Sequence, residues 1–264
     1  MDGQTFVDKT QNLTIAKLNY DRTPVFCLWY VQAEQWTTVL YVWRLPIFYD
    51  KYSFQYTYIE IGYNATSDFK NSYEISDCSS GNYFSVIPSN IRSLNANFDG
   101  LLQKLTEMNH SFSLIGLTET KYTTSQESLH CHNIPGYIFT SQPSLSNAGG
   151  TGFFVSDKLN FHVRDDLSES TVDYECLCID IPSKFKDDLI RGVIYRHPNS
   201  NPEAFWAFLN KSIGKINREN KYCIIMGDFS LYLLNSDSHS GTEEFLNTLG
   251  SYFFNLHILR PTNW

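Results

Sequence analysis

The sequence predicts a mixed α/β fold in which mainly antiparallel sheets lie between helices. Three segments show the apolar periodicity of amphipathic helices, and buried strand-like runs lie between them. Several of these runs follow one another without a helix, which favours antiparallel pairing of neighbours. The chain has 264 residues, 42% of them hydrophobic, so it is long enough to bury a large core.

The composition of the chain changes near residue 85. Residues 1–84 hold 19 of the 41 aromatic residues, a far higher density than in the rest of the chain. Alternating runs in this part, such as 52–63, predict strands, but no pattern in it indicates a role. We therefore expect an aromatic-rich N-terminal segment, 1–84, followed by a domain over 85–264.

Local patterns predict the elements of this domain. Helices are expected over 97–109, 201–217 and 242–256. Strands are expected over 112–120, 150–156, 160–164, 174–181, 188–196 and 222–229. Asn95 or Asn97 is available to cap the first helix, Pro202 suits the first turn of the second, and Ser240 or Thr242 suits the start of the third.

Composition excludes several classes of protein. No uncharged apolar run is long enough to span a membrane, and residues 1–13 lack the pattern of a secretory signal. The six cysteines show no zinc-like spacing, which indicates reduced thiols. We expect an intracellular protein of the nucleus or cytoplasm that is not secreted. The net charge of -8 argues against strong nonspecific DNA binding but allows a nuclease with a local acidic metal site.

Polar residues capable of chemistry stand where predicted strands end. Glu119, Tyr195 and Asp228 each close a buried run, and Asn90 follows a shorter one. Strand ends on one edge of an α/β sheet converge, so these side chains are expected to share a cleft. Two carboxylates with amide and phenol neighbours suit a hard divalent cation such as Mg²⁺. A lone acid at a strand end is more typical of a turn, so the argument depends on their coincidence.

Six segments of the chain form an ordered set of motifs: SNIRSLNANFDGLL (89–102), IGLTETKY (115–122), NIPGYIF (133–139), GGTGFFVSDKLNF (149–161), GVIYRHPNSN (192–201) and IIMGDFS (224–230). This set is similar to the endonuclease/exonuclease/phosphatase superfamily, and more narrowly resembles the apurinic-type endonuclease domain of non-LTR retrotransposons. The resemblance covers about 82–262. It implies a four-layer α/β sandwich with two sheets face to face and helices outside.

The resemblance also implies roles for individual residues. Glu119 matches the metal-binding glutamate, and Asn90 matches an asparagine beside that metal. Tyr195 matches a tyrosine that contacts the scissile phosphate, and Asn199 matches a neighbouring phosphate-contacting asparagine with an offset of one residue. Asp228 matches the aspartate that orients the attacking water. The implied reaction is Mg²⁺-dependent hydrolysis of DNA, with Mn²⁺ as an alternative metal and no organic cofactor.

The chain departs from the family pattern at three places. Pro88 and Ser89 stand where the family usually has strand residues before the asparagine, and because proline cannot donate to a strand ladder, we expect altered pairing or an altered position of Asn90 there. Ser230 stands where the Gly-Asp-Phe-Asn motif has asparagine, so a shorter hydroxyl group takes the place of an amide near the water. The family's C-terminal Ser-Asp-His does not occur, so we expect a sandwich incomplete at its C-terminal end and an impaired endonuclease. A noncatalytic binding or scaffold module with the same fold is the alternative, and phosphatase or deadenylase chemistry is a third hypothesis.

Overall fold

The computed structural model describes residues 83–123, 132–146, 148–182, 189–198, 200–219, 221–230, 240–252 and 254–256, together with seven strand segments before residue 83. Among the helices in these parts of the chain, none has the length and apolar character needed to cross a lipid bilayer.

The first sheet is built from four strands and one connecting helix: β9 (Val86–Asn90), α2 (Leu94–Met108), β10 (Leu114–Thr118), β11 (Tyr137–Gln142) and β12 (Thr151–Ser156). The strand order is β11-β12-β10-β9. Helix α2 carries the chain from β9 to β10, and these two strands are parallel. β12 pairs antiparallel with both β10 and β11, so this sheet is mixed.

The second sheet has seven strands: β3 (Phe26–Tyr30), β13 (His162–Val163), β14 (Glu169–Ser170), β15 (Tyr174–Ile181), β16 (Leu189–Arg196), β17 (Tyr222–Asp228) and β18 (Phe254–Leu256). β15 pairs antiparallel with β13, β14 and β16, as expected for strands without helices between them. Helix α3 (Pro202–Glu219) connects β16 to β17, and these strands are parallel.

One strand of the second sheet comes from the aromatic-rich segment. β3 lies between β17 and β18 and is parallel to both. The predicted strand region 52–63 contains β6 (Phe54–Thr57) and β7 (Glu60–Ile61). The remaining short strands of this segment and its boundary are β1 (Phe6–Val7), β2 (Thr14–Leu18), β4 (Leu40–Tyr41), β5 (Leu45–Pro46) and β8 (Tyr83–Phe84). A domain boundary near residue 85 stays a prediction.

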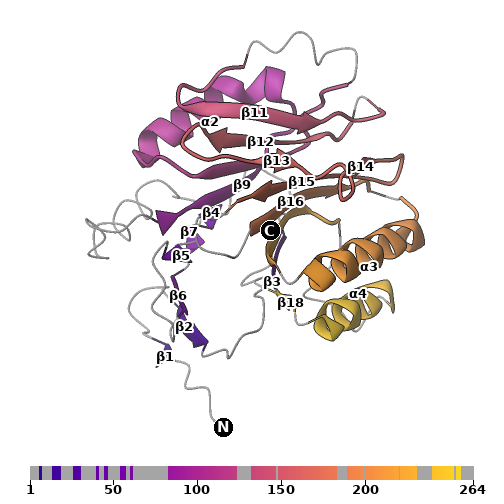
Figure 1. The fold of residues 1–264 in the computed structure, drawn as a ribbon. Helices are drawn as coiled ribbons and strands as arrows, with labels where there is room; N and C mark the ends of the chain where they lie inside the picture. Colours follow the sequence, from indigo (N-terminus) through magenta and orange to yellow (C-terminus); the bar gives the residue numbers. More distant parts are fainter. Residues whose placement is uncertain are drawn as a thin grey trace.

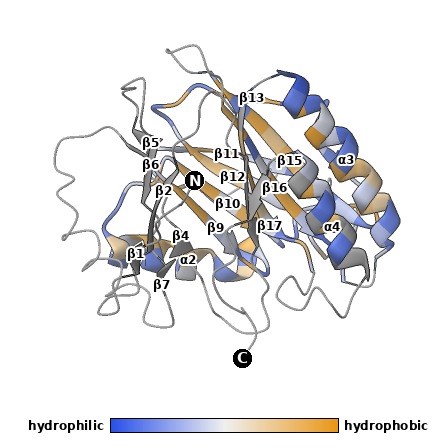
Figure 2. Cartoon of the chain, turned by 90° about the horizontal axis from the view of Figure 1, so that it is seen from below, coloured by the Kyte–Doolittle hydropathy of each residue, from blue (hydrophilic) through white to orange (hydrophobic). Residues whose placement is uncertain are grey.

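The two large sheets face each other, with α2 outside the first and α3 and α4 (Ser240–Ser251) outside the second (Figure 1). This is the predicted four-layer α/β sandwich. Figure 2 shows hydrophobic residues along the strands of both sheets. The core between the sheets is formed by aliphatic, aromatic and sulfur-containing side chains of both: Val86, Leu114, Phe153, Val155, Leu177, Ile179, Ile181, Val193, Ile224 and Met226.

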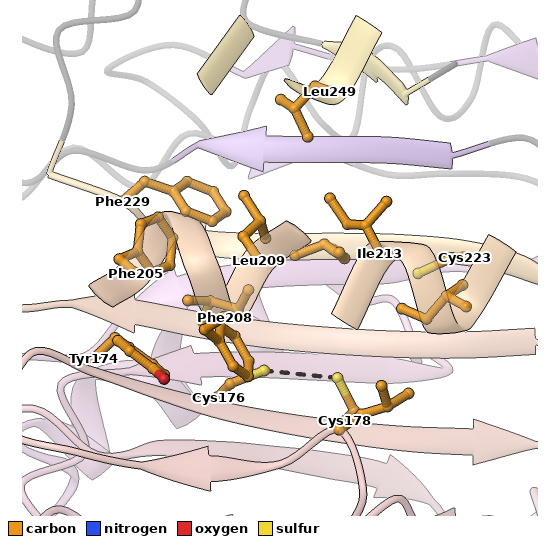
Figure 3. Close-up of a cluster of buried hydrophobic side chains, with 14 of the residues drawn as sticks. Tyr174, Cys176, Cys178, Phe205, Phe208, Leu209, Ile213, Cys223, Phe229 and Leu249 are labelled. Atoms are coloured by element: carbon orange, nitrogen blue, oxygen red, sulfur yellow. Dashed lines mark hydrogen bonds between the residues drawn. The ribbon is translucent and has the colours of Figure 1, made fainter. Parts of the chain in front are cut away.

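Two further cores lie between the sheets and the helices. Ile87, Ile115 and Phe154 of the first sheet pack with Leu94 and Leu101 of α2. On the other side, residues of the second sheet pack against helix residues that include Phe205, Leu209, Ile213, Phe245 and Leu249 (Figure 3). Cys176 and Cys178 belong to this core as buried thiols with their sulfur atoms 3.6 Å apart.

The sequence-based elements differ from the structure in three details. Ser93, not Asn95 or Asn97, caps α2, because its Oγ accepts a hydrogen bond from the backbone N–H of Ala96. The helix expected over 242–256 ends at Ser251, and Phe254–Leu256 form β18 instead. Strand β11 was not predicted.

Proline is accommodated in β9 because this strand lies at an edge of its sheet. Pro88 is opposite Gly116 of β10, and β9 is the last strand in the order of the first sheet. Proline has no N–H to donate, and edge strands tolerate this loss. The strand therefore continues to Asn90.

An ion-pair network ties the far end of α3 to the second sheet. Arg164 donates to both oxygens of Glu219, at 2.9 and 2.6 Å, and to Asp166. Lys221 pairs with Asp180 of β15 and lies 3.5 Å from Glu219. The hydrogen bonds from Arg164 lower the pKa values of Asp166 and Glu219 below their ordinary range.

Candidate active site

Three of the predicted site residues meet at one edge of the sandwich. Asn90 is the last residue of β9, Glu119 directly follows β10, and Asp228 is the last residue of β17. The Asn90 side-chain amide donates to Glu119 Oε1 at 2.8 Å and to Asp228 Oδ2 at 3.3 Å. One amide nitrogen therefore joins two carboxylates that come from different sheets.

Tyr195 lies beside Asp228 in the second sheet. The two residues are in register on β16 and β17, and Glu175 of β15 is in register with Tyr195 on the other side. Tyr195 is only 5% exposed. Burial, followed by the charges of Glu119, Asp228 and Glu175, raises the pKa of the phenol. Tyr195 is therefore held as a neutral hydrogen-bond donor.

Asp228 is a buried carboxylate, and each of its two oxygens accepts a hydrogen bond. Burial raises its pKa to about 7, and the charge of Glu119 acts in the same direction. The backbone N–H of Ser230 donates to Asp228 Oδ1 at 2.9 Å and opposes this rise, as does the amide of Asn90. The proton affinity of Asp228 is thus much higher than that of an exposed aspartate.

The turn at Gly227–Ser230 fixes the direction of Asp228. Gly227 has a φ of 144°, and a Cβ at this position would overlap the carbonyl oxygen of Ile194 on the neighbouring strand, so only glycine fits. After the strand, the buried side chain of Arg196 donates to the carbonyl oxygens of Phe229 (3.3 Å) and Ser230 (3.0 Å). Arg196 therefore clamps the turn that carries the carboxylate.

Backbone strain concentrates around this site. In the described part of the chain, several non-glycine residues have a positive φ. One of them, Asn109, ends α2 in the left-handed conformation that is common at helix C-termini. The others are two site residues, Glu119 and Ser230, and three residues close to the site in the chain, Arg92, Ser93 and Lys121. Such conformations are costly and are typical of functional sites, because the surrounding structure must hold them in place.

The donor set at this edge fits a hard divalent cation. The oxygen ligands are the carboxylates of Glu119 and Asp228, joined by the amide nitrogen of Asn90 without histidine or cysteine among these groups, and Glu119 is partly exposed. Within the described residues, no three His, Cys, Asp or Glu side chains form a metal-binding group. A cation held mainly through Glu119 and water molecules matches the coordination that Mg²⁺ prefers.

The structure brings most of the predicted site residues together. Asn90, Glu119, Asp228, Tyr195 and Ser230 share one edge of the sandwich. Asn199 lies outside the described residues.

Three residues next to this site were not predicted to take part in it: Glu175, Arg196 and His197. Of the three, only Glu175 stands out in the sequence, because it is an acid within the otherwise apolar run YECLCI. The other two are recognised only through contacts with distant segments.

The fold is similar to that of a solved AP endonuclease, LMAP from Leishmania major, with a TM-score of 0.51 at 13% identity. This agrees with the fold that the resemblance of the motifs implied. The match covers 64% of this chain and 66% of that enzyme, so this chain spans slightly less than two thirds of the enzyme's length. At this identity the likeness shows the fold and leaves the activity to be argued from the site.

Other solved structures match with lower TM-scores. The endonuclease domain of TRAS1, a telomere-specific non-LTR retrotransposon, is 14% identical with a TM-score of 0.47, over 64% of this chain and 72% of that one. The catalytic domain of Xenopus laevis APE2 is 17% identical with a TM-score of 0.45, over 62% of this chain and 67% of that one. No protein-family model and no curated protein sequence matches the chain.

Proposed function

We propose that the chain hydrolyses DNA phosphodiester bonds with the help of Mg²⁺, or of Mn²⁺ in its place. The observation that carries this proposal is the bridge that Asn90 makes between Glu119 and Asp228, with Tyr195 in register beside Asp228. Side chains from two sheets converge where a phosphate can be reached from several directions. Two acids joined in this way, with Asp228 buried, have no evident structural purpose at the edge of a sheet.

The proposed roles follow from the environment of each group. Tyr195 keeps its proton and donates a hydrogen bond to a non-bridging oxygen of the scissile phosphate. Asp228 accepts a hydrogen bond from the attacking water and directs it in line with the leaving oxygen. Ser230 holds Asp228 through its backbone N–H, and its hydroxyl lies 3.4 Å from the same carboxylate oxygen.

Glu119 and Asn90 form the proposed cation side of the site. Glu119 supplies the carboxylate ligand, and Asn90 keeps Glu119 and Asp228 in fixed relative positions. Bound there, Mg²⁺ would neutralise the negative charge that develops on the phosphate oxygens. Asn199 is proposed to contact a neighbouring phosphate of the DNA backbone.

The order of the motifs supports an endonuclease of the non-LTR retrotransposon type. Ser230 in place of asparagine removes an amide near the attacking water, which is consistent with a weakened enzyme. Loss of one such preorganised group costs on the order of 100- to 1000-fold in rate.

The test is nicking of supercoiled plasmid DNA by the purified chain with Mg²⁺, with Mn²⁺ and with EDTA. Glu119→Ala is expected to lower the rate by about 100-fold or more, because the cation loses its carboxylate ligand. Glu203→Ala, which changes an exposed acid at the start of α3, is the matched control and is expected to leave the rate unchanged. Absence of nicking by the unaltered chain with either metal would refute the proposal and support a noncatalytic module.

A further inference from the structure

Glu175 is a fully buried acid that the proposed reaction does not use. Its Oε1 atom accepts hydrogen bonds from Ser144 Oγ at 2.6 Å and from His197 Nε2 at 2.8 Å. The Ser144 hydroxyl has a second acceptor within reach, because its Oγ also lies 2.6 Å from the carbonyl oxygen of Ala148, which accepts from Ser146 Oγ as well. Glu175 Oε2 is buried without a hydrogen-bond partner in the described part of the chain. Burying a carboxylate oxygen without a hydrogen-bond partner costs free energy, so a functional reason for this arrangement is expected.

The backbone is shaped to admit the Glu175–His197 pair. A Cβ at Gly149 would lie 2.6 Å from Glu175 Oε2 and 2.9 Å from His197 Cε1. Gly149 also has a φ of 90°, which other residues rarely adopt. The loop before β12 can therefore close over the pair only because residue 149 has no side chain.

The pair is in contact with Tyr195 from two sides. Glu175 is in register with Tyr195 on the neighbouring antiparallel strand, so the two side chains lie on one face of the sheet. The His197 ring packs edge-on against the Tyr195 ring, with centroids 5.0 Å apart and an interplanar angle of 79°. Because Glu175 fixes the His197 ring, His197 in turn restricts the rotation of the tyrosine ring.

We propose that the Glu175–His197 pair positions Tyr195, so that its hydroxyl group points at the phosphate in the active site. This inference rests on the proposed nuclease function for its catalytic consequence, but the positioning itself is a property of the folded chain. Glu175 and His197 are positioning residues that act through Tyr195. A phenol displaced by about 1 Å would make a much weaker hydrogen bond to the phosphate in the transition state, and such a displacement corresponds to about a 100-fold loss of rate.

The experiment combines kinetics with a direct probe of the ring. 3-Fluorotyrosine placed at position 195 gives a ¹⁹F NMR signal that reports the ring's surroundings whether or not the chain nicks DNA. His197→Ala removes the packing ring, and the nearly isosteric Glu175→Gln removes the charge that holds it. His162→Ala, an exposed histidine on β13, is the matched control.

Both site variants are expected to shift or broaden the ¹⁹F signal and to lower kcat by about 10- to 100-fold with KM changed by less than about threefold. The control is expected to change neither. An unchanged ¹⁹F signal in a folded Glu175→Gln variant would overturn the inference, as would nicking rates equal to the control. Shifted signals in a chain that never nicks DNA would uphold the positioning of Tyr195 and refute the nuclease function.

Discussion

Replacing Asp228 by asparagine is expected to stabilise the folded chain when no cation is bound. The ionised carboxylate is buried beside Glu119, and its pKa is raised from 3.8 to about 7. Because the folded-state pKa lies above that of the unfolded chain, the stability that Asp228 contributes is fully present below pH 3.8 and is lost as the pH rises through 7. Asparagine has the same shape but never carries this charge.

The size of the effect follows from the shift in pKa. Raising it from 3.8 to about 7 corresponds to a cost of about 4 kcal/mol for the ionised form at pH 8.5. The variant loses the hydrogen bond from Asn90 to Asp228 Oδ2, because two amide groups then face each other, at a cost of about 1 kcal/mol. The net gain of about 3 kcal/mol raises Tm by about 6–10 °C.

The assay is calorimetric melting in EDTA at pH 8.5 and pH 5. The gain in Tm is expected at pH 8.5 and should shrink to a small fraction at pH 5, where Asp228 of the unaltered chain is largely protonated. Asp157→Asn changes an exposed acid after β12 and is the control. A variant that melts at or below the temperature of the unaltered chain at pH 8.5, or gains equally at both pH values, would refute this account of the site.

Three further changes test other parts of the structure. Ser230→Asn restores the amide of the family motif, and residue 230 has a φ of 47°, which asparagine adopts more readily than serine. The nicking rate should therefore rise at least about tenfold. No increase in kcat would contradict this. Gly227→Ala places a methyl group against the carbonyl oxygen of Ile194 and should cost about 3 kcal/mol or more, measured by urea unfolding; an unchanged midpoint would show the turn to be adaptable. Glu219→Gln breaks the ion pair with Arg164. Because the folded-state pKa of Glu219 is lowered, the stability that this carboxylate adds is present above its ordinary pKa of 4.5 and fades as the pH falls below that value. The Tm difference from the unaltered chain should therefore be present at pH 7 and narrow towards pH 3.5; a difference independent of pH would argue against the ion pair.

The sequence predicts the layers of the fold because they depend on local hydrophobic periodicity. β15 is buried along its whole length and β10 likewise, while α3 buries only the face that carries Phe205, Leu209 and Ile213. The pairs β9–β10 and β16–β17 are parallel because a helix crosses between their strands, whereas β15 and β16 follow each other without a helix and are antiparallel. These relations follow from the order of elements alone.

What the sequence does not predict depends on contacts between distant segments. The position of β3 between β17 and β18 joins residues about two hundred positions apart, and no local pattern specifies that partner. The end of α4 at Ser251 reflects the pairing of β18 with β3, which competes with helix propensity. His197 gains its relation to Glu175 only through the register of β15 and β16.

The distance between the two sheets also determines the geometry of the site. The bridge from Asn90 to Asp228 joins one sheet to the other, so its length depends on how closely the sheets approach behind it. Gly116 of β10 faces Met226 of β17, and a Cβ there would lie 2.5 Å from the methionine sulfur. Because Gly116 and Met226 precede Glu119 and Asp228 by only a few residues, this close contact sets the distance across which the two acids meet. The glycine inside a buried strand is therefore as much a part of the site's geometry as the polar residues at the strand ends.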